Sequence, residues 1–185
     1  MSLKAGTYSL NGNSGKVSAY TFKSGLLSKL AHDLLIDVTD FTVNIDVPED
    51  GFTSGSLGLE IQASSLKVVC AMKDGARQSD TLKEKDIADI EADMAKKVLH
   101  PDKYPTANFS SKSIQEKEGG YHISGELSLH GVTKSVDFDI DTSGGGLKGR
   151  FTIIQTDYKI KPFKAMMGTL KIKDEMDIGF DLALS

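Results

Sequence analysis

Apolar and polar residues alternate with a period of two along most of the chain, and this pattern constrains the fold more than any other feature. Tyr20 and Phe22 fall on one side of such a segment, and Val43, Ile45 and Val47 fall on one side of another. Because successive side chains of a β-strand point to opposite faces, this alternation predicts strands that bury one face and expose the other. The fold class is therefore mainly β.

The alternation changes phase between two neighbouring segments. Leu34, Ile36 and Val38 keep one phase, and the series that begins at Phe41 keeps the opposite one. A shift of one residue would turn every side chain to the wrong face, so we expect a bulge or a sharp bend near residues 39–40. Short turns join the segments throughout, which predicts a meander of about eight antiparallel strands closed into one β-barrel.

Residues 82–99 depart from this alternation. Apolar residues recur there at spacings of three and four, at Ile87, Ile90, Met94 and Val98. That spacing is typical of an amphipathic helix. Thr81 and Glu84 have the spacing of a capping box at its start, and Pro101 ends it because proline cannot continue the hydrogen-bond ladder. We expect one helix, lying across or beside an opening of the barrel.

Length and charge narrow the class of protein. A chain of 185 residues corresponds to one domain, and neither a repeat nor a linker divides residues 1–185. The net charge of −4 and the absence of a long basic run argue against a nucleic-acid partner. No apolar stretch approaches the roughly 18 to 20 residues of a membrane helix. Cys70 is the single cysteine, so no internal disulfide is expected.

The first residues decide the expected compartment. Residues 1–5 resemble either a tag or the remnant of a leader, and they run almost directly into the first patterned segment. If they replace a leader, we expect a periplasmic protein. If the chain is native as written, we expect a cytoplasmic one.

Chemistry-bearing residues form no recognisable catalytic or metal motif. The four histidines match no HExxH pattern, and neither a CxxC pair nor a calcium loop occurs, so no metal or cofactor is predicted. His32 begins a strand at the expected barrel mouth, where its simplest role is to satisfy a backbone carbonyl. Asp86, Asp89 and Asp93 form a stripe on the helix that we assign to its solvated face, away from its apolar side. Cys70 has no base nearby in the sequence, so no catalytic residue is predicted.

Several segments resemble the YceI-like family of lipid- and polyisoprenoid-binding proteins. The resemblance extends from about residue 6 to the end of the chain, and its most specific part is the hairpin with the sequence LHGVTK. The segments that carry it are LAHDLLIDVTDF (30–41), KKVLHPDKYPTANFSSKSI (96–114), ISGELSLHGVTKSVDFDI (123–140), GRFTIIQTDYKI (149–160) and DEMDIGFDLALS (174–185). Residues 70–84 depart from the Arg-Asp-x-x-Leu pattern of many members, which leaves the identity of the ligand open.

The resemblance implies a lipocalin-like barrel that binds, sequesters or transports a long apolar amphiphile, either an isoprenoid or a fatty-acyl lipid. Met-rich loops adapt well to such ligands, and residues 161–168 form an apolar loop with two methionines between lysines. We expect the ligand to contact Phe22, Ile36, Val38, Phe41, Val43, Leu59, Leu127, Phe138, Phe151, Phe163, Met166, Met167 and Phe180.

Three alternatives stay open from the sequence. Alternating apolar residues describe a barrel filled by its own side chains equally well, because periodicity does not distinguish a filled interior from a hollow one. His32 is the residue on which an enzyme acting on a lipid-like substrate would depend. An interaction module, dimeric through a sheet edge or through residues 161–168, is the third.

Overall fold

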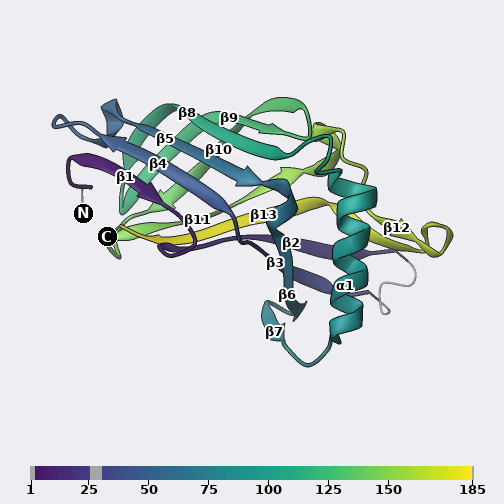
Figure 1. Cartoon of the computed structure of the whole chain (residues 1–185). Coiled ribbons are helices and arrows are strands. Elements are labelled where there is room, and N and C mark those ends of the chain that lie inside the picture. The colour runs from purple at the N-terminus through teal and green to yellow at the C-terminus, as the bar shows by residue number, and fades with distance from the viewer. Residues whose placement is uncertain (1–2, 26–30, 185) are drawn as a thin grey trace.

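The computed structural model describes residues 3–25 and 31–184, which form one antiparallel sheet curled on itself and one helix (Figure 1). Residues 1–5 were predicted to be a tag or the remnant of a leader, and two of them, residues 1–2, lie outside the described residues. The strands are β1 (Gly6–Leu10), β2 (Gly15–Ser24), β3 (Asp33–Val38), β4 (Phe41–Val47), β5 (Ser56–Gln62), β6 (Leu66–Lys73), β7 (Ala76–Gln78), β8 (Thr106–Lys117), β9 (Gly120–Leu129), β10 (Val132–Asp141), β11 (Gly146–Ile154), β12 (Lys164–Ala165) and β13 (Leu170–Ala183).

The order of the strands corrects the predicted architecture. The path runs β1-β4-β5-β8-β9-β10-β11-β13-β2-β3-β6-β7, with β12 paired to β13, so the described residues form a 13-stranded curled sheet and not an eight-stranded barrel. The chain adds short strands of five, three and two residues (β1, β7 and β12) that are too brief for alternation to reveal. Bends also divide longer segments into separate strands, which raises the count further.

The predicted phase change at residues 39–40 is a bend shared by two neighbouring strand pairs. Thr39 donates its amide to the Ser65 carbonyl (3.1 Å), and Gln62 donates its amide to the Asp40 carbonyl (3.0 Å). β3 therefore passes into β4 at the level where β5 passes into β6. The bend lets Val38 before it be buried on the same interior face as the residues after it, despite the change of phase.

The helix covers one end of the curled sheet, opposite the end where both termini lie (Figure 1). It comprises α1 (Glu84–Asp93) and continues as a π-helical turn, Met94–Leu99, which confirms the predicted helix with a start two residues later. The cap differs from the predicted pair of Thr81 and Glu84, because the Lys83 amide donates to the Asp86 carboxylate (3.0 Å). Glu91 fastens α1 to β6 by accepting the Val68 amide (2.9 Å). Among the described residues, no helix has the length and apolar character to cross a membrane.

An aromatic cluster fills part of the interior, centred on Phe138. The ring centroids of Phe109, Phe151 and Phe180 lie 5.2, 4.7 and 5.9 Å from that of Phe138. Glycine makes room for the cluster, because a Cβ at Gly125 would lie 2.4 Å from the Phe109 ring. The cluster therefore brings four aromatic rings together in this part of the interior.

Candidate functional site

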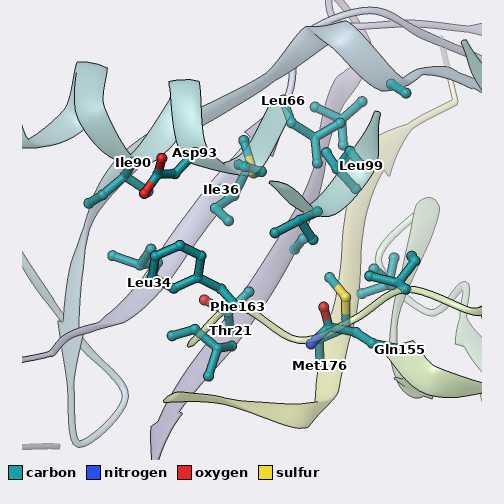
Figure 2. Close-up of a pocket in the computed structure, with 18 of the residues that line it drawn as sticks. Thr21, Leu34, Ile36, Leu66, Ile90, Asp93, Leu99, Gln155, Phe163 and Met176 are labelled. Carbon is teal, nitrogen blue, oxygen red and sulfur yellow. The ribbon is translucent and has the colours of Figure 1, made fainter. Parts of the chain in front are cut away.

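An apolar cavity of about 370 Å³ lies between α1 and the curled sheet and is partly open to solvent; we call it the outer cavity (Figure 2). The helix contributes Ile90, Met94, Val98 and Leu99 to its wall. β2 and β3 contribute the opposite side, and Leu34 and Ile36 point into the space in Figure 2. Burying Ile90 and Met94 against β3 and β6 gives the helix its apolar contacts, so the same face that holds the helix in place also forms the cavity wall.

A smaller cavity of about 110 Å³, the inner cavity, continues deeper into the sheet and reaches the aromatic cluster. Phe109, Phe138, Phe151 and Phe180 border it. Six residues line both cavities: Val17, Ile61, Ala107, Leu129, Ile153 and Ile178. The two cavities therefore adjoin at a girdle formed by these six apolar side chains.

Few polar groups interrupt the walls. The Thr21 hydroxyl is buried beside the outer cavity and has no hydrogen-bond partner within the described part of the chain. Gln155 is buried and donates its side-chain amide to the Lys173 carbonyl (2.8 Å). A buried polar atom without a partner costs free energy unless a ligand or water supplies the missing hydrogen bond. Thr21 is therefore the group best placed to hydrogen bond to a polar atom of a ligand.

The charged residues on the outer cavity are acidic. Asp89 and Asp93 border it, contrary to the expectation that these helix acids face only solvent. Asp93 forms an ion pair with Lys97 (2.7 Å), and the Lys97 ammonium lies 5.6 Å from the centroid of the Phe163 ring. Of the described residues that line either cavity, none is Lys or Arg. The charged side chains that line the outer cavity are therefore two carboxylates, of which Asp93 is paired with Lys97.

The predicted ligand contacts divide into three groups. Ile36, Val38 and Phe163 line the outer cavity. The inner cavity is lined by Val43, Leu59, Leu127, Phe138, Phe151 and Phe180. Phe22, Phe41 and Met167 line neither: Phe22 is half-buried beneath Lys173, Phe41 is packed in the core, and Met167 is exposed at a hairpin tip. The side chain of Met166 lies outside the described residues.

The sequence predicted a helix across or beside the opening, but its apolar residues Ile90, Met94 and Val98 were not among the predicted ligand contacts, although they line the outer cavity. Sequence reasoning also missed Thr21 and Gln155, for which no pattern exists, because an isolated polar residue carries no periodicity. His32, on which the enzyme alternative depends, does line the outer cavity. Among the described residues, however, no three His, Cys, Asp or Glu side chains gather in a group that would hold a metal.

His130 anchors the segment that follows the helix. It lies at the turn between β9 and β10, and its ring centroid is 4.0 Å from that of Tyr104 and 5.8 Å from that of His100. Both ring nitrogens are buried, and the polar group that acts on the ring among the described residues is the Tyr158 main chain. Burial lowers the pKa of His130 from its ordinary value, and the charges of His100 and Lys103 act in the same direction, against the opposing influence of the Tyr158 main chain.

We expect the stability of the protein to fall as the pH drops below about 6.5, in part because of His130. The unfolded chain binds a proton on this ring near its ordinary pKa, whereas the folded protein resists protonation to a lower pH. The contribution is therefore complete above that range and is lost as the pH falls toward the lowered pKa. Urea unfolding at several pH values will measure it. His130→Gln is expected to flatten the slope, and an unchanged slope in the variant would contradict this role.

Comparison with known proteins gives one family and several similar folds. The YceI-like domain matches residues 8–184, and no curated protein sequence matches the chain. BcnA from Burkholderia cenocepacia has a TM-score of 0.70 at 17% identity, covering 95% of this chain and 99% of that one. A polyisoprenoid binding domain from Saccharophagus degradans, implicated in plant cell wall breakdown, has a TM-score of 0.57 at 14% identity, covering 96% of each chain. A YceI protein from Campylobacter jejuni has a TM-score of 0.53 at 14% identity, covering 81% and 85%.

Proposed function

The chain belongs to the YceI-like domain family, and from this premise we propose that it binds and carries a long, single-chain amphiphile, a polyisoprenoid or a fatty-acyl lipid, inside the curled sheet. The main observation in support is the pair of adjoining apolar cavities, of about 370 and 110 Å³, between α1 and the aromatic cluster. These cavities favour the proposal over a sheet filled wholly by its own side chains, because they leave apolar wall surface that a ligand tail would cover.

The energetics favour a long tail. Each methylene transferred from water to an apolar wall contributes about 0.8 kcal/mol, so a tail of about fifteen carbons contributes on the order of 12 kcal/mol. Association costs roughly 4 to 15 kcal/mol, which leaves useful affinity only when most of the tail is buried. The nine predicted contacts that line the two cavities are the residues that we propose bury it.

The similar folds support the same class of ligand. The domain from Saccharophagus degradans is described as binding a polyisoprenoid, and its fold covers nearly all of this chain. We propose binding and not catalysis, because the described walls of both cavities are almost wholly apolar, which favours burial of a tail over activation of a reacting group. The acidic rim at Asp89 and Asp93 and the unpartnered Thr21 hydroxyl favour a ligand whose polar end is neutral.

Displacement of a neutral apolar fluorophore, N-phenyl-1-naphthylamine, tests this function. We expect hexadecanol to displace the dye and palmitate to do so about tenfold less well at neutral pH, since the charged side chains that line the outer cavity are acidic and Lys97 pairs with only one of them. Thr21→Val keeps the shape of the side chain and removes the hydroxyl. It is expected to weaken the binding of hexadecanol and so to reduce the difference in affinity between hexadecanol and palmitate. Mass spectrometry of organic extracts of the purified protein will identify any lipid that it already holds.

Two results would contradict the proposal in different ways. If neither the alcohol, the acid nor the dye binds, and the extracts hold no lipid, the carrier function is wrong. If the chains bind but palmitate binds as well as hexadecanol, only the preference for a neutral polar end is wrong.

A further inference from the structure

Residues 159–173, which we call the lysine segment, concentrate positive charge beside the outer cavity. They contain five lysines, at positions 159, 161, 164, 171 and 173, and none of the 26 acidic residues of the chain. The chain as a whole has a net charge of −4, so this segment opposes the sign of the rest of the protein. None of its lysines takes part in an ion pair among the described residues.

The lysine segment contains a projecting hairpin with an apolar tip. β12 and the start of β13 pair through Lys164 with Lys171 and through Ala165 with Leu170, and the hairpin extends beyond the body of the sheet in Figure 1. Met167 lies at its tip with a φ of 54° and a relative exposure of 104%. Among the described residues the next most exposed large apolar side chain is Val69, at 37%. A fully exposed methionine between lysines has no partner within the described chain.

The same segment forms part of the wall of the outer cavity. Phe163, Leu170 and Ile172 line the cavity, and the Ile172 amide donates to the Phe163 carbonyl (3.0 Å), which ties the two sides of the hairpin base together. The base of the hairpin therefore borders the space proposed for the ligand, while Met167 at its tip is exposed and none of its lysines lines the cavity. A surface that engaged the tip would lie next to the opening of the cavity.

We propose that the lysine segment docks the protein on an anionic lipid bilayer, with Met167 inserted among the head groups and the outer cavity held at the membrane surface. A bilayer supplies both features that the hairpin requires, a negative surface for the lysines and an apolar layer for the methionine. The acidic remainder of the protein is repelled by the same surface, so the hairpin end turns toward the membrane. Docking of this kind gives an amphiphile a path between bilayer and cavity that avoids bulk water.

Vesicle flotation tests the docking. Vesicles of phosphatidylcholine with about 30% phosphatidylglycerol are expected to bind the full chain, and vesicles of phosphatidylcholine alone are not. Each lysine near a charged surface is worth about a fivefold change in affinity, so Lys164→Gln with Lys171→Gln is expected to weaken binding about 25-fold. Met167→Asp is expected to weaken it by a comparable factor, and salt at about 0.5 M to abolish most of it.

Lys85→Gln with Lys134→Gln is the matched control, because it removes the same charge from exposed lysines on α1 and β10. We expect it to weaken vesicle binding by less than about threefold, since it changes only the net charge. Equal loss in the control, equal binding to both kinds of vesicle, or no binding to either would overturn the proposal. Polyglutamate that competes fully with the anionic vesicles would instead indicate an acidic protein partner and would also overturn it.

This test is independent of the proposed ligand. The displacement of N-phenyl-1-naphthylamine is measured without vesicles, and the lysine and Met167 variants are expected to retain it because none of these side chains lines a cavity. A protein that binds the dye and no vesicle would leave the carrier function standing and remove the docking.

Discussion

Replacing Ala107 with phenylalanine is expected to weaken binding of hexadecanol more than 100-fold while the protein stays folded. Ala107 is one of the six residues that line both cavities, where the outer cavity adjoins the inner one. A phenyl ring at this girdle occupies space that about four tail methylenes would fill, which corresponds to about 3 kcal/mol of lost burial. Because the ring enters a space that is hollow, it displaces fewer neighbouring side chains than it would in a close-packed core. Displacement titration measures the affinity.

A second measurement separates blocking from unfolding. Urea unfolding of Ala107→Phe is expected to give a midpoint close to that of the parent protein. Ala92→Phe adds the same ring to an exposed position of α1 that lines neither cavity, and it is expected to leave hexadecanol binding unchanged. Tight binding in a folded Ala107→Phe variant would show that the ligand tail does not pass this girdle.

The sequence was sufficient for the class of fold, and the physical reason lies in periodicity. Alternation in β4 reports burial directly, because Phe41, Val43 and Ile45 are buried while their neighbours are more exposed. The phase change before Phe41 likewise predicted the bend that the structure contains. The sequence could not predict whether the sheet closes into a barrel. That depends on short edge strands such as β7, whose three residues are too few to show an alternating pattern.

The candidate site was less accessible to the same reasoning. Phe41 and Val43 share one face of β4, yet Val43 borders a cavity and Phe41 does not. Alternation records that a side chain points inward, but the space in front of it depends on the strands across the sheet. Phe22 shows the other limit, because it belongs to an alternating strand and still ends half-buried beside Lys173.

The π-helical turn at Met94–Leu99 shows how a local irregularity shapes the site. In a regular α-helix, residues three and four apart share one face. The wider turn brings Val98 and Leu99, which are neighbours in sequence, onto the wall of the outer cavity together. Such turns are rare and concentrate at functional sites, which agrees with a helix whose C-terminal part bounds the ligand space.

Phe138→Ala is expected to destabilise the protein by about 3 to 5 kcal/mol. Its ring contacts three other phenylalanine rings with centroids at 4.7 to 5.9 Å, and all of these contacts are lost together. The site has little capacity to collapse, because it already adjoins the inner cavity and the new space merges with it. For a chain of this length, each kcal/mol lowers the unfolding midpoint by about 2 to 4 °C, so a fall of about 10 °C is expected. Urea unfolding gives the free energy, and calorimetry gives the midpoint.

Phe22→Ala is the matched control, because it removes the same side chain from a half-buried position that borders neither cavity. We expect it to cost less than Phe138→Ala by at least about 2 kcal/mol, since the Phe22 ring is only partly buried and its ring contact is with one lysine. Phe138→Leu refills part of the space and is expected to recover roughly half of the lost stability. Equal losses in Phe138→Ala and Phe22→Ala would show that the aromatic cluster adds nothing to the stability of the sheet.

The inner cavity is enlarged in Phe138→Ala, and this has a consequence for binding. A longer alcohol such as eicosanol is expected to gain affinity relative to hexadecanol in this variant, because its tail then reaches the space that the ring has left.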